Sequence, residues 1–197
     1  PRQASPTPVS EIIRRPAFIT AAVTGAVAYG TMDLVMTSTP LEMMACGFAV
    51  AASATVIQAH AVAMFAPGFV TGRLIARFGV RRVITWGIVL NALSVAVALL
   101  GVSFWHFVAA LVLLGVGWNF MFQGATNLLG ESHSPAERVR AQATNDFLVF
   151  GTVAFTALSS GAVHAGFGWN VLNLALLPAL AISLVMVLRR PTMARPA

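Results

Sequence analysis

Six apolar runs of about twenty residues each constrain this chain more than any other feature. They fall at about residues 17–38, 51–72, 83–103, 106–129, 140–163 and 170–188. A helix of about twenty residues crosses the hydrocarbon core of a bilayer, which is about 30 Å thick. With 58% hydrophobic and 9% charged residues, the chain is too apolar for a soluble domain. The sequence therefore predicts an all-α integral membrane protein, a bundle of six transmembrane helices.

The basic residues predict the topology of these helices. All twelve are Arg, and they fall before the first run, between the second and third, between the fourth and fifth, and after the sixth. Every Arg is thus on one side of the membrane, which the positive-inside rule makes cytoplasmic. We expect a multi-pass plasma membrane protein with both ends of this chain inside the cell. The net charge of +6 therefore reports topology, and no nucleic acid partner is expected.

Composition also divides the chain. Residues 1–16 begin with the Pro- and Ser-rich stretch PRQASPTPVS without an initiator Met, and they are expected to form a cytoplasmic linker inside a larger protein. Residues 17–188 form the expected six-helix transmembrane domain, and residues 189–197 a cytoplasmic tail. Cys46 is the single cysteine, so no disulfide framework is expected. No cofactor and no metal site is predicted. Arg without Lys, with abundant Ala, Val and Gly, indicates a GC-rich bacterial source and hence an inner membrane.

The strongest motif is GRLIARFGVRR, at the cytoplasmic turn between the second and third runs. Glycine suits a tight turn at a helix end, and we expect Gly72 and Gly79 to serve there. The stretch resembles the signature loop of the major facilitator superfamily, matching it at five positions: Gly72, Leu74, Arg77, Gly79 and Arg81. Ala76 replaces the Asp of the consensus, as in the weaker second copy between helices eight and nine.

This resemblance implies that the chain is the C-terminal half of a twelve-helix transporter. Its partners would be the lipid bilayer, a small-molecule substrate and the missing N-terminal six-helix half. The substrate site would lie near the bilayer midplane between the halves. The flanking sequence VIQAHAVAMFAPGFVTGRLIARFG further resembles bacterial members that include riboflavin carriers.

Two acidic residues within the runs are candidate functional groups, because an ionisable side chain inside a membrane is costly. Asp33 lies about 24 Å from the cytoplasmic start of the first run. It could exchange a coupling proton, contact substrate, bond another helix or sit at the interface. Asp146 lies near the cytoplasmic start of the fifth run. It could form a gate-type ion pair, by resemblance with an Arg of the missing half, or contact substrate.

Neutral polar residues supply further candidates. Asn119, Gln123 and Asn127 recur at i, i+4 and i+8 of the fourth run and so share one helix face. They could hydrogen-bond a polar substrate or a neighbouring helix, and Trp118 beside them offers an aromatic wall. Asn119 and Gln123 are the better candidates because Asn127 is close to the cytoplasmic end. Gln58 and His60 point about 200° apart, so one is expected to pack and the other to face the cavity.

These features favour secondary transport of a small molecule by alternating access, with proton coupling as one possibility. No GxxxxGK[ST] loop supports ATP drive within this chain. An intramembrane enzyme would have Ser160 and His164 as its best pair, but no oxyanion arrangement or HExxH motif accompanies them, and no catalytic residue is predicted. A non-transporting scaffold or a self-dimerising half transporter is the alternative, against which the polar residues argue.

Overall fold

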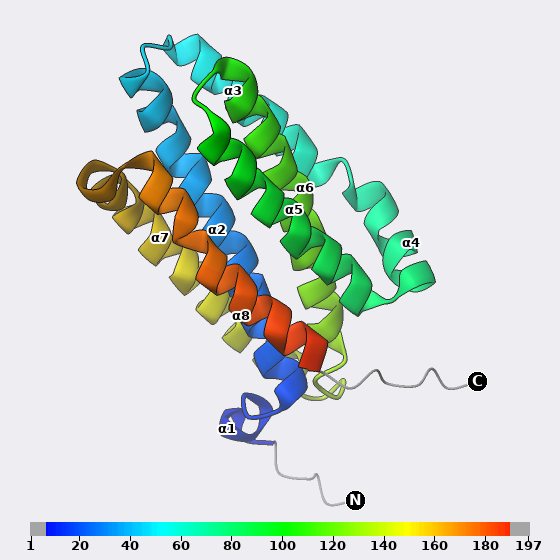
Figure 1. Ribbon diagram of the computed structural model, residues 1–197. Coiled ribbons are helices and arrows are strands. Elements are labelled where there is room, and N and C mark those ends of the chain that lie inside the picture. Colours follow the sequence, from blue (N-terminus) through cyan, green and yellow to red (C-terminus); the bar gives the residue numbers. More distant parts are fainter. Residues whose placement is uncertain (1–6, 190–197) are drawn as a thin grey trace, which may run out of the picture.

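All regular structure in the described residues is helical. The computed structural model describes residues 7–189, and Figure 1 shows its helices packed side by side. They are α1 (Val9–Ile12), α2 (Pro16–Ala45), α3 (Val50–Phe65), α4 (Gly68–Phe78), α5 (Val80–Leu100), α6 (Phe104–Gly130), α7 (Arg138–Leu174) and α8 (Leu176–Arg189). No strand occurs in this range, and the all-α prediction is confirmed.

The chain crosses the bundle in single and in broken helices. α2, α5 and α6 are each long and apolar enough to span a bilayer, and α3 with α4 can form one span that bends by 40°. α7 and α8 together cover 52 residues, or about 78 Å of straight helix, more than twice the hydrocarbon thickness. Gly168 interrupts this stretch with a φ of +75°, and Figure 1 shows the chain turning back, so that α8 runs antiparallel to most of α7. The stretch therefore supplies two of the six predicted crossings.

Two helices extend beyond the spans that the sequence predicts. The first predicted span ends near residue 38, whereas α2 continues through Pro40 to Ala45. The second ends at residue 72, whereas α4 continues to Phe78. Hydropathy marks the end of apolar character, but Leu, Met, Ala and Arg favour helix beyond it. Gly72 therefore lies inside α4, and the prediction that it occupies a helix end is wrong. Gly79, with a φ of +86°, makes the turn.

The basic segments meet at one end of the bundle. Figure 1 shows α1, the start of α2 and the end of α8 at that end. The α4–α5 turn joins them there, because the Arg81 guanidinium donates a hydrogen bond of 2.6 Å to the Leu188 carbonyl of α8. The described Arg residues thus gather on one face of the membrane domain.

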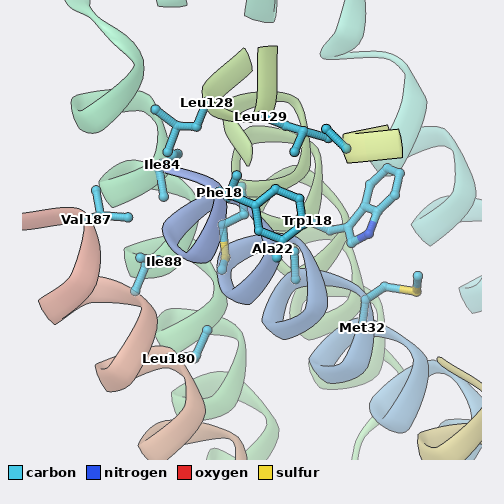
Figure 2. Close-up of a cluster of buried hydrophobic side chains, with 14 of the residues drawn as sticks. Phe18, Ala22, Met32, Ile84, Ile88, Trp118, Leu128, Leu129, Leu180 and Val187 are labelled. Atoms are coloured by element: carbon cyan, nitrogen blue, oxygen red, sulfur yellow. The ribbon is translucent and has the colours of Figure 1, made fainter. Parts of the chain in front are cut away.

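The core is built around α6, which packs most extensively against α5, α2 and α3. Figure 2 shows one of two buried hydrophobic clusters, with Phe18 and Ala22 of α2 lying between side chains from α5, α6 and α8. Trp118 of α6 lies at the edge of this cluster. Lipid is as apolar as these side chains, so close packing holds the helices together.

Glycine allows the closest of these contacts. At Gly87 of α5, an added Cβ would lie 2.7 Å from the Gly117 carbonyl oxygen of α6 and 2.9 Å from the Met121 backbone nitrogen. Both atoms belong to the backbone and cannot turn away as a side-chain end could. The α5–α6 contact therefore depends on the missing side chain at Gly87.

We predict that Gly87→Ala destabilises the protein by about 1–3 kcal/mol, the usual cost of overpacking. The matched control is Gly151→Ala in α7, where nothing lies within 4 Å of the new Cβ. The control should gain up to about 1 kcal/mol from helix propensity. Thermal unfolding in detergent measures both, and equal midpoints for the two variants would contradict this packing.

The segment before α2 is attached to the loop between α6 and α7. Both guanidinium nitrogens of Arg15 donate to the carboxylate of Glu137 at 2.8 Å, and Arg15 also donates to the Ser132 carbonyl. Arg140 donates to the Thr7 carbonyl, and Ile12 of α1 is fully buried. Residues 7–15 of the expected linker therefore pack on the bundle, while residues 1–6 and 190–197 lie outside the described residues.

This ion pair predicts a pH dependence of stability. The hydrogen bonds from Arg15, and next the Ser134 N–H, hold the pKa of Glu137 well below its ordinary value of 4.5. A carboxyl with a lowered folded-state pKa stabilises the fold above its unfolded pKa and loses that contribution as the pH falls. We expect the thermal unfolding midpoint to decrease as the pH is lowered from 5 to 3, and to decrease by less in Arg15→Gln. Arg14→Gln, at an exposed position, should retain the wild-type pH profile.

Candidate functional site

Asp33 lies buried between α2 and α7. Its carboxylate accepts a hydrogen bond of 2.7 Å from the hydroxyl of Thr156, and its residue is 8% exposed. It lies about 26 Å along α2 from Pro16, and Thr156 lies about 27 Å along α7 from Arg138. Among residues 7–189, no Arg or His forms an ion pair with it. The carboxylate thus lacks a counter-ion in the described chain, and one hydroxyl is its contact across the α2–α7 interface.

Asn119 forms hydrogen bonds with the helix segments on both sides of the break between α3 and α4. Pro67 lacks an N–H, so the helix ladder is interrupted at this point. The Asn119 amide donates to the Met64 carbonyl at 2.7 Å, and its oxygen accepts a hydrogen bond of 2.6 Å from the Thr71 hydroxyl. Asn119 is 3% exposed and bonds both segments of the broken span. These contacts use its amide for helix-to-helix bonding, one of the two alternatives open from the sequence.

The other polar candidates separate in space. Gln123 and Asn127 are exposed on α6 although Asn119 is buried. His60 is fully buried, and its Nδ1 lies 2.8 Å from the Leu111 carbonyl of α6. Gln58 is exposed, so His60 is the packing member of that pair.

Trp118 belongs to an aromatic cluster formed by Tyr29, Phe65, Trp118, Phe122 and Phe150. The rings of Trp118 and Phe122 are stacked, with centroids 5.2 Å apart. Tyr29 meets both edge-on at 5.1 and 4.9 Å. Phe65 lies 6.0 Å from Trp118, and Phe150 lies 5.9 Å from Tyr29. Four helices, α2, α3, α6 and α7, thus place aromatic rings on one surface.

Of these five residues, only Trp118 is predicted from the sequence as a site residue. The i, i+4 spacing of Trp118 and Phe122 was a readable signal for a shared helix face. Tyr29 is the single tyrosine of the chain and lies in mid-run, which is a second signal. Phe65 and Phe150 join the cluster through packing between helices, which spacing along one helix does not report.

The signature loop and Asp146 lie at the Arg-rich end. Leu74 and Arg77 are in α4, and the Arg77 guanidinium lies over the Phe78 ring at 5.1 Å. Asp146 accepts a 2.8 Å hydrogen bond from Gln142. It lines a groove of about 350 Å³ with four other α7 residues: Arg138, Val139, Gln142 and Ala143. Within residues 7–189, no Arg forms an ion pair with Asp146.

A second contact between α2 and α7 lies at the opposite end. The His164 imidazole and the Glu42 carboxylate are 2.8 Å apart. The sequence does not predict this pairing, because His164 falls at a span end and Glu42 is 122 residues away. Figure 1 shows this end of α2 and the α7 turn far from the Arg-rich end.

Comparison with known proteins decides the family. The model of the Major Facilitator Superfamily matches residues 21–197. The chain belongs to this superfamily. It is 44% identical over 183 residues to the riboflavin transporter RfnT of Brucella anthropi, an alignment that covers 93% of this chain and 46% of that protein. It is also similar to two uncharacterised MFS-type transporters of Bacillus subtilis, YddS (34% identity over 146 residues) and YdeG (37% over 145).

The matched region is a part of each relative. The two Bacillus alignments cover 73% of this chain and 34% of each protein, so the chain spans less than half the length of the curated relatives it matches. No solved structure matches the chain. The family predicted from the sequence is thus confirmed, and the relatives that the chain matches are named as transporters and not as enzymes.

We predict that Asn119→Ala destabilises the protein by about 1–3 kcal/mol, because it leaves the Met64 carbonyl without its donor inside the membrane domain. Gln123→Ala, one turn along α6 and exposed, is the matched control and should change stability by less than about 0.5 kcal/mol. Thermal unfolding of both variants in detergent measures the difference. Similar losses would mean that Asn119 does not support the broken span.

Proposed function

We propose that this chain forms the C-terminal six-helix half of a twelve-helix secondary transporter that couples alternating access to proton movement at Asp33. The observation that carries the proposal is the buried Asp33 carboxylate, held by Thr156 across the α2–α7 contact. A buried ionisable group in a membrane domain marks an ion or substrate pathway by default. Membership of the superfamily supplies the transport context.

The proposed orientation places the Arg-rich end in the cytoplasm of a bacterial cell. The positive-inside rule supports it, since the described Arg residues gather at one end of the bundle. In this orientation residues 1–16 precede the membrane domain as a linker from the N-terminal half, residues 17–188 form the membrane domain, and residues 189–197 form a cytoplasmic tail. Asp33 then lies in the outer half of the bilayer.

Proton binding at Asp33 changes what the α2–α7 contact can do. The ionised carboxylate only accepts hydrogen bonds, whereas the protonated acid also donates one. The Thr156 hydroxyl has alternative acceptors in its own helix, the Thr152 and Val153 carbonyls at 3.0 and 3.1 Å. Protonation of Asp33 therefore allows the Thr156 hydroxyl to bond only these α7 carbonyls, and the α2–α7 contact to rearrange. Such a two-state contact is what a proton-coupled transporter requires.

Asp146 is proposed to form the cytoplasmic latch. It lines an open groove on α7, and its described partners are the neutral Gln142 and Asn145. An Arg from the N-terminal half, seated in this groove, would complete a charge-assisted pair. The signature loop residues, including Arg77 and Arg81, are proposed to shape the same cytoplasmic end.

A flavin is the proposed substrate. This rests on the similarity to the riboflavin transporter of Brucella anthropi over nearly all of this chain. Among the residues predicted from the sequence, Trp118 and the exposed Gln123 remain proposed substrate contacts. Asn119 and His60 are proposed to support the helices that carry those contacts.

The test is uptake by the full-length transporter in proteoliposomes. We expect Asp33→Asn to lose proton-driven riboflavin accumulation by at least tenfold while retaining exchange of labelled for unlabelled riboflavin, because exchange needs no net proton movement. Thr156→Val, which removes the hydroxyl, should weaken accumulation in the same direction. Unchanged accumulation in Asp33→Asn would overturn the coupling role.

Thr55→Val is the matched control for Thr156→Val. The Thr55 hydroxyl is exposed and donates only to the Ala51 carbonyl of its own helix. Its loss should leave accumulation unchanged. If the wild type accumulates no solute under a proton gradient, that result would favour the alternative of a non-transporting scaffold.

A further inference from the structure

Two polar groups in the aromatic cluster have no hydrogen-bond partner among the described residues. The Trp118 Nε1–H is buried and unpaired, in a residue that is 4% exposed. Tyr29 is half-buried, and its hydroxyl forms no hydrogen bond within residues 7–189. Buried Tyr and Trp side chains usually find a partner for these groups. Two polar groups on one aromatic surface are therefore available for hydrogen bonding.

Tyr29 and Trp118 also lie deep in the membrane, where such side chains are unusual. Tyr29 lies about 20 Å along α2 from Pro16, and Trp118 lies about 21 Å from the start of α6 and about 18 Å from its end. Both are near the middle of a bilayer about 30 Å thick. Tyr and Trp concentrate instead at the interfaces, where their polar groups meet water. At mid-depth the buried, unpaired Trp118 N–H costs free energy, so packing alone would favour Phe or Leu at that position.

The rings around these groups form an open surface. Phe65 and Phe150 are 67% and 56% exposed, while Tyr29 and Phe122 are half-buried. Each exposed ring contacts one of the two residues with an unpaired polar group: Phe65 contacts Trp118, and Phe150 contacts Tyr29. A flat ring lying on this surface meets faces and edges of several aromatic side chains, the arrangement that favours aromatic pairs.

We propose that the aromatic cluster is the subsite that binds a planar heteroaromatic ring of the transported solute, with the Trp118 indole N–H and the Tyr29 hydroxyl bonding acceptors on that ring. This rests on the proposed transport function and deepens it. Carbonyl oxygens and ring nitrogens are suitable acceptors for both groups. Tyr29 and Trp118 are the central residues, because each contacts three other rings of the cluster.

The subsite adjoins the proposed coupling site. Tyr29 and Asp33 are four residues apart in α2, so their side chains lie on one helix face a single turn apart. Phe150 and Thr156, their respective contacts, both belong to α7. One α2–α7 contact thus carries a ring-binding residue and an ionisable residue. The solute and the proton would act on the same pair of helices.

Binding of riboflavin to the purified full-length transporter tests the subsite. Stacking on aromatic side chains quenches flavin fluorescence, which reports binding without transport. Two competitors divide the ligand: lumichrome has the ring without the sugar alcohol, and ribitol has the sugar alcohol without the ring. We expect lumichrome to displace riboflavin and ribitol to fail at a hundredfold higher concentration.

Variants locate the binding. Tyr29→Leu and Phe122→Leu should weaken riboflavin binding at least tenfold, and Tyr29→Phe should recover the part due to ring contact. Trp118→Phe, which keeps an aromatic ring and removes the N–H, should weaken binding about fivefold, as expected for one hydrogen bond. Phe155→Leu is the matched control, since Phe155 is 72% exposed on α7 and outside the cluster, and it should bind as the wild type does.

The outcomes separate this inference from the transport proposal. Riboflavin binding that is unchanged in Tyr29→Leu and Trp118→Phe overturns the subsite, because the ring then binds elsewhere. Proton-driven uptake of a solute without an aromatic ring, with no riboflavin binding, overturns the subsite and the flavin substrate and leaves proton-coupled transport at Asp33 standing. Ring-dependent binding that these variants weaken supports the subsite even if no uptake is measured, a result that would overturn transport alone.

Discussion

Every break in a membrane-spanning helix must be satisfied by the protein itself, because the bilayer interior has no water to bond a free carbonyl or N–H. The bend between α3 and α4 is the place where this constraint shapes the molecule. Pro67 interrupts the ladder, and Asn119 of α6 bonds the segments on both sides of the bend. One amide from a neighbouring helix thus makes a bent span compatible with lipid.

The hydrogen bonds of Asn119 also influence the geometry of the aromatic surface. Phe65 is the last residue of α3, next to the carbonyl that Asn119 binds, and Trp118 is the residue before Asn119. The Met64–Asn119 hydrogen bond therefore brings together the residues that carry the Phe65 and Trp118 rings, which lie 6.0 Å apart. The stacked Phe122 follows on the next turn of α6. A contact that satisfies the backbone thus aligns the rings that are proposed to bind solute.

The sequence predicts the helices better than it predicts their contacts. Runs of apolar residues locate the spans because the hydrocarbon core sets their length, but helix propensity extends α2 and α4 beyond the apolar runs. Trp118 and Asp33 were recognisable because an aromatic residue in an amide stripe and a carboxylate in an apolar run are individually unusual. Thr156 and Phe150 carry no such signal. Both are ordinary residues of α7 whose importance comes from packing against α2.

Packing of α7 makes the contact with α2 the place where solute and proton can influence each other. α7 has its most extensive contacts with α2 and much smaller ones with α5, α6 and α8. A change at the Asp33–Thr156 hydrogen bond therefore acts on an interface that few other helices restrain. Tyr29 and Phe150 belong to this same interface, one to two turns nearer the proposed cytoplasmic side. Movement of α7 along or away from α2 alters the separation of these two rings and hence the shape of the aromatic surface. A proton at Asp33 and a ring beside Tyr29 would then bias one equilibrium between two arrangements of α2 and α7, which is the thermodynamic requirement for coupling their movements.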